Sequence, residues 1–495
     1  MTRLGLRHGM RRIAPLAWPV FVGQVAVLAF STVDTVLVAR TTAIELAALA
    51  VGAAVYISVF IGLMGIVLAI GPIAGQLFGA GKPERAGHEL QQAVWLAVFL
   101  ALPGSLVLLV PEPFLALSRA EPAVAARVRS YLGGLVFALP PALVFTAFRG
   151  FNVAVSRPKA VMAMQMGGLA LKVPLSALFV FGVALPTPFG ELRVPALGIV
   201  GCALATAIVM WCQLAGALWL LRVDPFYRRF GLGTGTPLAP PRRASLAALL
   251  RLGVPIGLAT VVEVTGFTFM AFFVSRIGAT AVAGHQIAAN LVAMMFMMPL
   301  AIANAASTLV AQQIGAGDAA DARRIGWAGL EVAAAIAAVV GSVVYLLREH
   351  VVALYTANPV IAAAALPLLA WVALFHVADA TQTVAAFVLR AYRIATMPLV
   401  VYVLAVWGIG LGGGYLMAFD LLDVSPQWMQ GARGFWATAT LGLVVAALGL
   451  SALLADRMRR DTSPALLRKA AERIAPSPAP PSEREGSAPL GPPGR

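Results

Sequence analysis

Four ionisable residues lie deep inside long apolar segments of this chain: the acids Asp34, Glu263 and Asp379, and the base Lys172. Asp379 lies eleven residues before Arg390, roughly 16 Å along a helix, and therefore near the middle of a bilayer-spanning segment. Glu263 is about 12 residues into its own segment, at roughly 18 Å. A charge at such a depth costs several kcal/mol unless it is protonated, paired or hydrated, so these residues are candidates for function.

Glu263 and Asp379 have the matched depth and the chemistry of a cation site. Burial and mutual repulsion would let a close pair of carboxyl groups hold a proton near neutral pH. Oxygen ligands from Glu263, Asp379 and Asn290 could instead coordinate sodium, in which case the two acids are the metal ligands. A simpler alternative is that the acids only hydrogen-bond to neighbouring helices and fix their packing. The same alternative applies to Asp34, which lies nearer to water.

Lys172 is roughly 15–20 Å from either end of its segment, too deep for its side chain to reach water unless a cavity is present. In the first of two interpretations, it forms a structural ion pair with Asp34. In the second, the ammonium takes the place of a bound cation on Asp34 and gives way to a substrate or a proton. The sequence leaves both interpretations open.

Three further residues are candidates for a proton relay or a substrate cavity. His376 lies three residues before Asp379, and Gln382 lies three residues after it. Met294 belongs to a methionine cluster, and thioether side chains adapt to varied apolar ligands. Ordinary packing in the membrane is the alternative role for the methionines.

The wider sequence supplies membrane-spanning helices to hold these residues. Of the 495 residues, 60% are hydrophobic and only 12% are charged, whereas soluble domains are about a quarter charged. Apolar runs of about 18 or more residues recur along most of the length. We therefore predict an all-α membrane protein with twelve transmembrane helices, at residues 14–37, 47–71, 90–110, 128–148, 159–182, 196–221, 252–275, 283–310, 325–347, 361–389, 397–418 and 434–455.

The basic residues distinguish the two sides of the membrane. With the N-terminus in the cytoplasm, the cytoplasmic segments hold 27 of the 36 Lys and Arg residues, and the outer loops hold 8. This asymmetry follows the positive-inside rule and predicts that both termini are cytoplasmic. The net charge of +15 is thus explained by orientation in a lipid bilayer, and we expect no nucleic-acid partner.

The two halves of the chain repeat. A shift of 236 residues places Pro19 on Pro255 and residues 76–81 on residues 312–317. Because each repeat has an even number of spans, the halves are parallel repeats, and transporters of this build bind substrate between their lobes. The expected division is an N-terminal lobe at 1–222, a cytoplasmic linker at 223–250, a C-terminal lobe at 251–457, and a disordered cytoplasmic tail at 458–495 that is dispensable for transport.

At these residues the chain resembles the multidrug and toxic compound extrusion (MATE) family, on its NorM-like branch. The similarity runs in order over about residues 10–457. The matching features are Pro19, Asp34, Glu263, residues 284–290 and 298–300, Asp379-Ala380-Thr381-Gln382, Leu389-Arg390, and the Gly-Ala-Gly turns after the second and eighth spans.

The resemblance implies a V-shaped pair of six-helix lobes around a central cavity. It also implies export of amphipathic, often cationic, drug-like compounds in exchange for Na⁺ or H⁺ by alternating access, with no further cofactor. By position, Glu263 and Asp379 would bind the coupling cation, and Asp34 would be the acid of the N-lobe cavity. We expect a monomer in a bacterial cytoplasmic (inner) membrane. The chain departs from the family at Lys172, where an asparagine is common, so a second cation site there would face a fixed positive charge.

Two other functions are considered. A flippase for lipid-linked saccharides on a related fold would need a cavity lined with Arg and Lys to hold phosphates. The buried residues of this chain are three acids against one lysine, which argues against that function. The sequence contains no Walker loop, no metal-spaced His and Cys set and no nucleophile elbow, so we do not expect an enzyme.

Overall fold

The computed structural model describes residues 3–118, 121–187, 190–233, 237–423 and 425–461. The tail predicted at 458–495 lies outside the described residues from position 462 onward. The N-terminal half contains α1 (Arg3–Val38), α2 (Ala43–Val67), α3 (Ile70–Gly79), α4 (Pro83–Leu109), α5 (Glu112–Ser118), α6 (Pro122–Leu135), α7 (Leu139–Ala154), α8 (Pro158–Phe181), strands β1 (Val183–Thr187) and β2 (Gly190–Val194), and α9 (Ile199–Val223).

The linker and the C-terminal half are also mainly helical. They contain the 3₁₀ helix η1 (Pro225–Phe230), α10 (Arg243–Ser275), α11 (Ala279–Ala316), α12 (Ala319–Leu346), α13 (Arg348–Tyr355), α14 (Pro359–Ala391), α15 (Thr396–Tyr402), the π-helix η2 (Val403–Gly412), α16 (Gly413–Ala418), the 3₁₀ helix η3 (Gln427–Met429) and α17 (Ala432–Asp461).

The predicted all-α membrane architecture is confirmed, with one bent span. Eleven helices among the described residues are long and apolar enough to cross a membrane, and the pair α6 and α7 brings the number to 12 if it is one span. The pair bends by 49° at its break. Prolines at the start of α7 explain the break, because a proline has no backbone N–H to continue the hydrogen bonds of α6 into α7.

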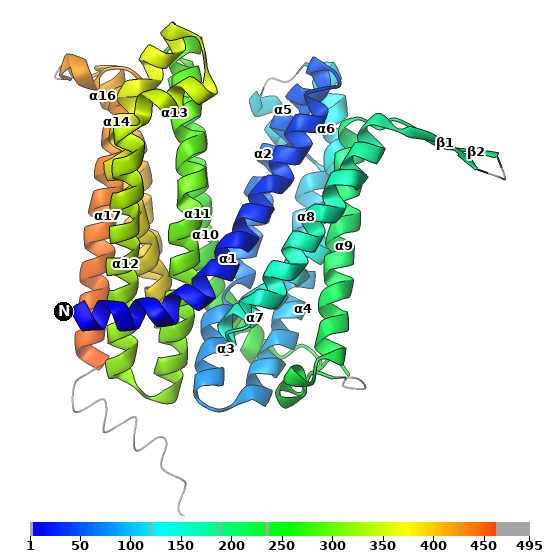
Figure 1. The fold of residues 1–495 in the computed structure, drawn as a ribbon, viewed down its shortest axis with the longest axis vertical. Helices are drawn as coiled ribbons and strands as arrows, with labels where there is room; N and C mark the ends of the chain where they lie inside the picture. The colour runs from blue at the N-terminus through cyan, green and yellow to red at the C-terminus, as the bar shows by residue number, and fades with distance from the viewer. Residues whose placement is uncertain (1–2, 119–120, 188–189, 234–236, 424, 462–495) are drawn as a thin grey trace, which may run out of the picture.

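A small hairpin departs from the all-helical prediction. Strands β1 and β2 pair antiparallel, from Val183 opposite Val194 to Thr187 opposite Gly190. Figure 1 shows the hairpin projecting away from the helices, beyond the ends of α8 and α9. The segment between the predicted fifth and sixth spans is thus partly β structure, since two extended segments of equal length can satisfy each other's backbone groups.

The helices form two groups that lie side by side and diverge toward one end (Figure 1). Helix α1 links them. Its early residue Ile13 packs in the apolar core of the C-terminal half, and Arg12 forms an ion pair with Asp321 of α12 at 2.6 Å. Two prolines inside α1, Pro15 and Pro19, remove backbone hydrogen bonds and let the helix turn toward α8. The predicted boundaries of the two lobes remain a prediction.

The two halves touch through positions related by the 236-residue repeat. A Cβ atom on Gly79 would lie 1.9 Å from the carbonyl oxygen of Gln312, and one on Gly315 would lie 1.9 Å from that of Gln76. Glycine is needed at both positions because any side chain would clash with backbone. The side chain of Gln76 donates to the carbonyl of Ala391, the last residue of α14, and Gln312 donates to that of Ala154, the last residue of α7, at 2.8 and 2.7 Å.

The described part of the linker is held against α4. Gln92 donates to the carbonyl of Pro240 at 3.0 Å and accepts from the backbone N–H of Arg242 at 2.6 Å. The indole N–H of Trp95 donates to the carbonyl of Ala239 at 2.9 Å. The segment that enters the C-terminal half is therefore fixed to the N-terminal half.

Candidate functional site

Glu263 on α10 and Asp379 on α14 face one another across a shared amide. The side-chain amide nitrogen of Gln382 lies 2.9 Å from Asp379 Oδ1 and 3.5 Å from Glu263 Oε1. Asp379 and Gln382 are three residues apart, which places them on the same face of α14. The structure thus brings together three residues that the sequence singled out.

The hydroxyl of Tyr402, at the end of α15, sets the orientation of that amide. It donates a short hydrogen bond to Gln382 Oε1. Because this oxygen is occupied, the NH₂ group of Gln382 points at the acids and can donate to both. Gln382 is neutral, so it positions the two carboxylates without cancelling their charge.

A small cavity opens beside the two acids, between α10, α14, η2 and α17. The cavity has a volume of about 40 Å³, which is enough for a few water molecules or a small ion. Apart from Glu263 and Asp379 its walls are apolar: Gly266, Phe267, Met270, Phe375, Val406, Gly410, Leu411, Ala439 and Leu443. Two acids within such walls suit a coupling ion.

One wall of the cavity is the π-helix η2. A π-helix widens the turn and frees backbone groups, and π segments occur often at functional sites. The carbonyl of Gly410 accepts from the Thr438 hydroxyl at 2.9 Å, and the indole of Trp407 donates to the carbonyl of Val262 at 3.1 Å. The second bond ties the π-helix to the residue next to Glu263.

Arg390 is a basic residue near the end of α14, eleven positions after Asp379. Its guanidinium lies over the Phe387 ring, 4.1 Å from the ring centre. With both acids ionised, the two carboxylates and this guanidinium together carry one net negative charge. Among the described residues, no group of three or more His, Cys, Asp or Glu side chains could hold a metal ion. Sodium would therefore need water or backbone oxygens beside the two acids.

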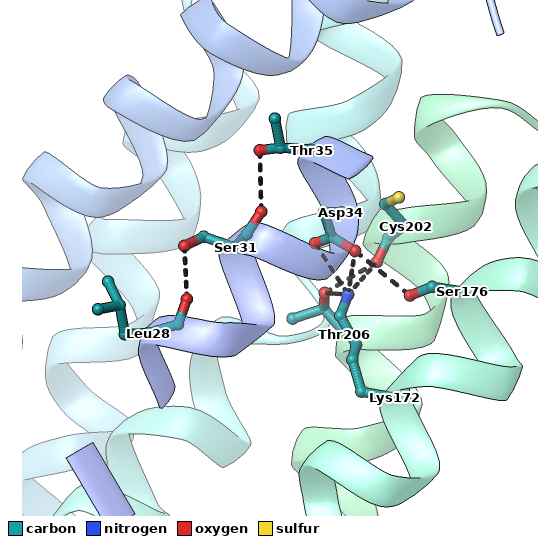
Figure 2. A network of polar contacts seen from close by, with 8 residues as sticks. All are labelled: Leu28, Ser31, Asp34, Thr35, Lys172, Ser176, Cys202 and Thr206. Carbon is teal, nitrogen blue, oxygen red and sulfur yellow. Dashed lines mark hydrogen bonds and ion pairs between the residues drawn. The ribbon is translucent and has the colours of Figure 1, made fainter. Parts of the chain in front are cut away.

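The N-terminal half buries a second cluster, shown in Figure 2. Lys172 on α8 is fully buried, and its Nζ lies 2.8 Å and 2.9 Å from the two carboxylate oxygens of Asp34 on α1. The contact between Lys172 and Asp34 is the one that both sequence interpretations require. The hydroxyl of Ser176, one helical turn after Lys172, donates to Asp34 Oδ1 at 3.3 Å.

Helix α9 completes this cluster with two neutral oxygens. Lys172 Nζ lies 2.6 Å from the Thr206 hydroxyl and 3.2 Å from the carbonyl of Cys202. The Thr206 hydroxyl also donates to the Cys202 carbonyl at 2.8 Å, which leaves its oxygen lone pairs for the ammonium. The four-residue spacing of Cys202 and Thr206 on one helix face makes this arrangement possible.

Three other sequence candidates lie apart from these bonds. Asn290 is exposed on α11 and is not among the residues that line the C-terminal cavity. Met294, one turn further along α11, is also exposed and does not line it. His376 is buried on α14, and its Nδ1 has no hydrogen-bond partner within the described part of the chain. Their assigned roles remain predictions.

Sequence reasoning missed Tyr402 and Thr206. Each is a polar residue within a predicted apolar span, and that was the only available signal. Neither lies near its hydrogen-bond partner in the sequence, since Tyr402 is 20 positions from Gln382 and Thr206 is 34 positions from Lys172. Only the packing of α15 and α9 brings them to the clusters.

Comparison with known proteins identifies relatives along nearly the whole chain. The MatE family model matches residues 19–178 and 255–416, once in each half. A probable multidrug resistance protein NorM of Aromatoleum aromaticum is 40% identical, and the match covers 90% of this chain and 93% of the relative. The multidrug resistance protein PmpM of Pseudomonas aeruginosa is 32% identical, with 92% and 93% covered.

Solved structures show the same fold. The eukaryotic MATE transporter AtDTX14 superposes with a TM-score of 0.81 at 18% identity, covering 95% of this chain and 99% of the other. An outward-facing multidrug resistance MATE transporter superposes with a TM-score of 0.79, also at 18% identity, covering 93% and 97%.

Proposed function

Because this chain belongs to the MatE family, we propose that it is a multidrug efflux antiporter that exports amphipathic, often cationic, compounds in exchange for Na⁺ or H⁺. The family's members are transporters rather than enzymes, and the names of the relatives support multidrug efflux. The observation that carries the exchange mechanism is the Glu263–Gln382–Asp379 cluster beside an apolar cavity, with one net negative charge once the Arg390 guanidinium is counted.

One uncompensated negative charge can couple two cations of different kinds. A coupling ion on Glu263 and Asp379, or an organic cation bound beside them once the small cavity has widened, would each neutralise it, and together they would leave a buried positive charge. Burying an unpaired charge is unfavourable by several kcal/mol, so the two bind alternately. Alternate binding at one site is what an antiporter requires.

The contacts between the halves support alternating access. The Gln76–Ala391 and Gln312–Ala154 hydrogen bonds hold the halves together at one end, and the halves diverge toward the other end. Opening the closed end requires both bonds to break. Since residues of the two repeats occupy matched positions there, one rocking motion would break both together.

We place the transporter as a monomer in a bacterial cytoplasmic membrane, with both termini in the cytoplasm because of the distribution of Lys and Arg. The flippase alternative is less compatible with the two clusters. Lys172 is occupied by Asp34, so it is not available to a phosphate. The cavity in the C-terminal half has acids and no basic residue in its lining.

The test is efflux of a cationic dye from proteoliposomes, with a sodium gradient and a proton gradient imposed separately. We expect one of the two gradients to drive dye transport, and the same gradient to fail with Glu263→Gln protein. Liposomes without protein supply the leak rate. Dye transport that neither gradient accelerates would contradict antiport, and transport of lipid-linked saccharide in its place would favour the flippase.

A further inference from the structure

The ammonium of Lys172 lies where a bound cation would lie. Four oxygens surround its Nζ: both carboxylate oxygens of Asp34, the Thr206 hydroxyl and the Cys202 carbonyl, at 2.6–3.2 Å. They come from α1 and α9, whereas the lysine comes from α8 (Figure 2). A carboxylate, a hydroxyl and a backbone carbonyl form the kind of all-oxygen ligand set that binds hard cations.

The charge of this cluster is balanced within the protein. Asp34 contributes one negative charge and Lys172 one positive charge, and Ser176 and Thr206 are neutral. A further monovalent cation would give this largely buried cluster a net positive charge, which is unfavourable in a low-dielectric interior. Without the lysine, the same oxygens would retain one uncompensated negative charge and a space of ammonium size.

We propose that the Asp34–Cys202–Thr206 oxygens form a monovalent-cation site that the chain fills with its own Lys172 ammonium, so that the N-terminal half binds no coupling ion. The inference rests on the proposed antiport, because it assigns coupling to the Glu263 and Asp379 pair alone. The ligand class for the vacated site is a small monovalent cation, either an alkali-metal ion or a short alkylammonium ion.

The experiment measures melting temperature in detergent in the Glu263→Gln, Asp379→Asn double variant, so that ions cannot bind to those two carboxylates. Sodium, lithium and n-propylammonium chlorides are each titrated against choline chloride at equal ionic strength. Lys172→Ala is then added to vacate the site, and Asp34→Asn is added to that variant as the matched control. No drug and no gradient is used, so failure of the proposed transport function would leave this test unaffected.

With Lys172 present, we expect the melting temperature to respond to all four salts alike. With Lys172→Ala, we expect a saturating rise of a few degrees for at least one of the small cations over choline, because a ligand that binds only the folded state stabilises it. Asp34→Asn should abolish that rise. If the folded Lys172→Ala protein responds to all four salts alike, the site does not bind cations and the proposal is wrong.

A second measurement applies if Lys172→Ala does not fold. The double variant with Lys172 intact is compared with its Asp34→Asn derivative in the same titration. A sodium- or lithium-specific rise that requires Asp34 would show that the site is open to ions despite the lysine, and would overturn the proposal. We expect that neither the double variant nor its Asp34→Asn derivative shows a sodium- or lithium-specific rise in melting temperature.

Discussion

Both halves of the molecule bury carboxylates among apolar helices, but the groups that face those carboxylates differ. Asp34 faces the ammonium of Lys172 at 2.8 Å. Glu263 and Asp379 face the neutral amide of Gln382, and the nearest basic residue along α14 is Arg390, eleven positions after Asp379. With the acids ionised, the first cluster is neutral and the second retains one negative charge.

The difference separates two uses of a buried acid. A charge-balanced pair is stable as it stands, and a mobile ion gains little by joining it. A cluster with one charge left over is unfavourable until a cation or a proton arrives, and this requirement can be used to couple transport to an ion gradient. In the proposed mechanism, the same parallel repeat thus holds a fixed ion pair in one half and an exchanging site in the other.

The comparison predicts its largest effect at the exchanging site. Glu263→Gln and Asp379→Asn should each reduce gradient-driven dye efflux by about a hundredfold or more, because each removes the uncompensated charge that binds the ion. The rate of dye efflux is measured in proteoliposomes, and thermal melting checks that each variant is folded. Glu349→Gln on α13, at an exposed carboxylate outside the candidate spans, is the control and should transport normally. Normal efflux by either site variant would remove that residue from the coupling mechanism.

The next effect concerns the balanced pair. Lys172→Ala or Asp34→Ala leaves an uncompensated buried charge, so each should lower the free energy of unfolding by about 3–5 kcal/mol. The double variant should lose less than the sum, with a coupling energy of about 0.5–3 kcal/mol. A double-mutant cycle from thermal melting in detergent measures it. Additive effects would mean that the two charges do not interact.

A smaller effect is expected from the residue that orients the amide. Tyr402→Phe removes the hydroxyl that holds Gln382 Oε1, and we expect a stability loss of about 1–3 kcal/mol from the unpaired buried amide. Since Gln382 can then turn its oxygen toward the acids, the half-saturating concentration of the coupling ion should shift by about tenfold. Tyr56→Phe, at a partly buried tyrosine of α2, is the control. An unchanged ion dependence in Tyr402→Phe would contradict this role.

The smallest effect is expected for an ion pair outside the membrane-spanning helices. The backbone N–H of Phe226 and the Arg157 guanidinium lower the pKa of Asp224 below its ordinary 3.8. The ionised Asp224 therefore stabilises the folded protein above about pH 4, and this stabilisation is lost as the pH falls through the lowered pKa of Asp224 in the folded state. Asp224→Asn should destabilise by less than about 1 kcal/mol at pH 7, since the pair is partly exposed. The difference in melting temperature from the unaltered protein should disappear on acidification, and a difference that persists at low pH would contradict this role of the carboxylate.

The sequence predicted how deep each buried charge lies along its helix better than which way its side chain faces. Helical rise is fixed at about 1.5 Å per residue, so counting residues correctly placed Glu263 with Asp379, and Asp34 with Lys172. Rotation about a helix axis could not be predicted in the same way, because lipid and protein core are both apolar and membrane helices lack a strong polar face. Asn290 was therefore expected at the C-terminal acids, yet it is exposed on α11 and does not line their cavity.

Hydrogen-bond partners that come from distant helices could not be predicted from the sequence either. Tyr402 reaches Gln382 only because α15 packs against α10 beside α14, and Thr206 reaches Lys172 only because α9 packs on α8. The turns at which the two halves touch were more predictable from the sequence. The repeated Gly-Ala-Gly segments end α3 and α11 with Gly81 and Gly317 at φ of 67° and 82°, where glycine is favoured.

The most direct test of the account is the ion-to-drug ratio at equilibrium in proteoliposomes, with the membrane potential clamped at zero. One uncompensated charge in the C-terminal half and none in the N-terminal half predict one monovalent cation per transport cycle. A tenfold gradient of the coupling ion should then balance a drug gradient of about tenfold. Balance at about a hundredfold would mean that two ions move per cycle, and would contradict the claim that Lys172 already fills the N-terminal cation site.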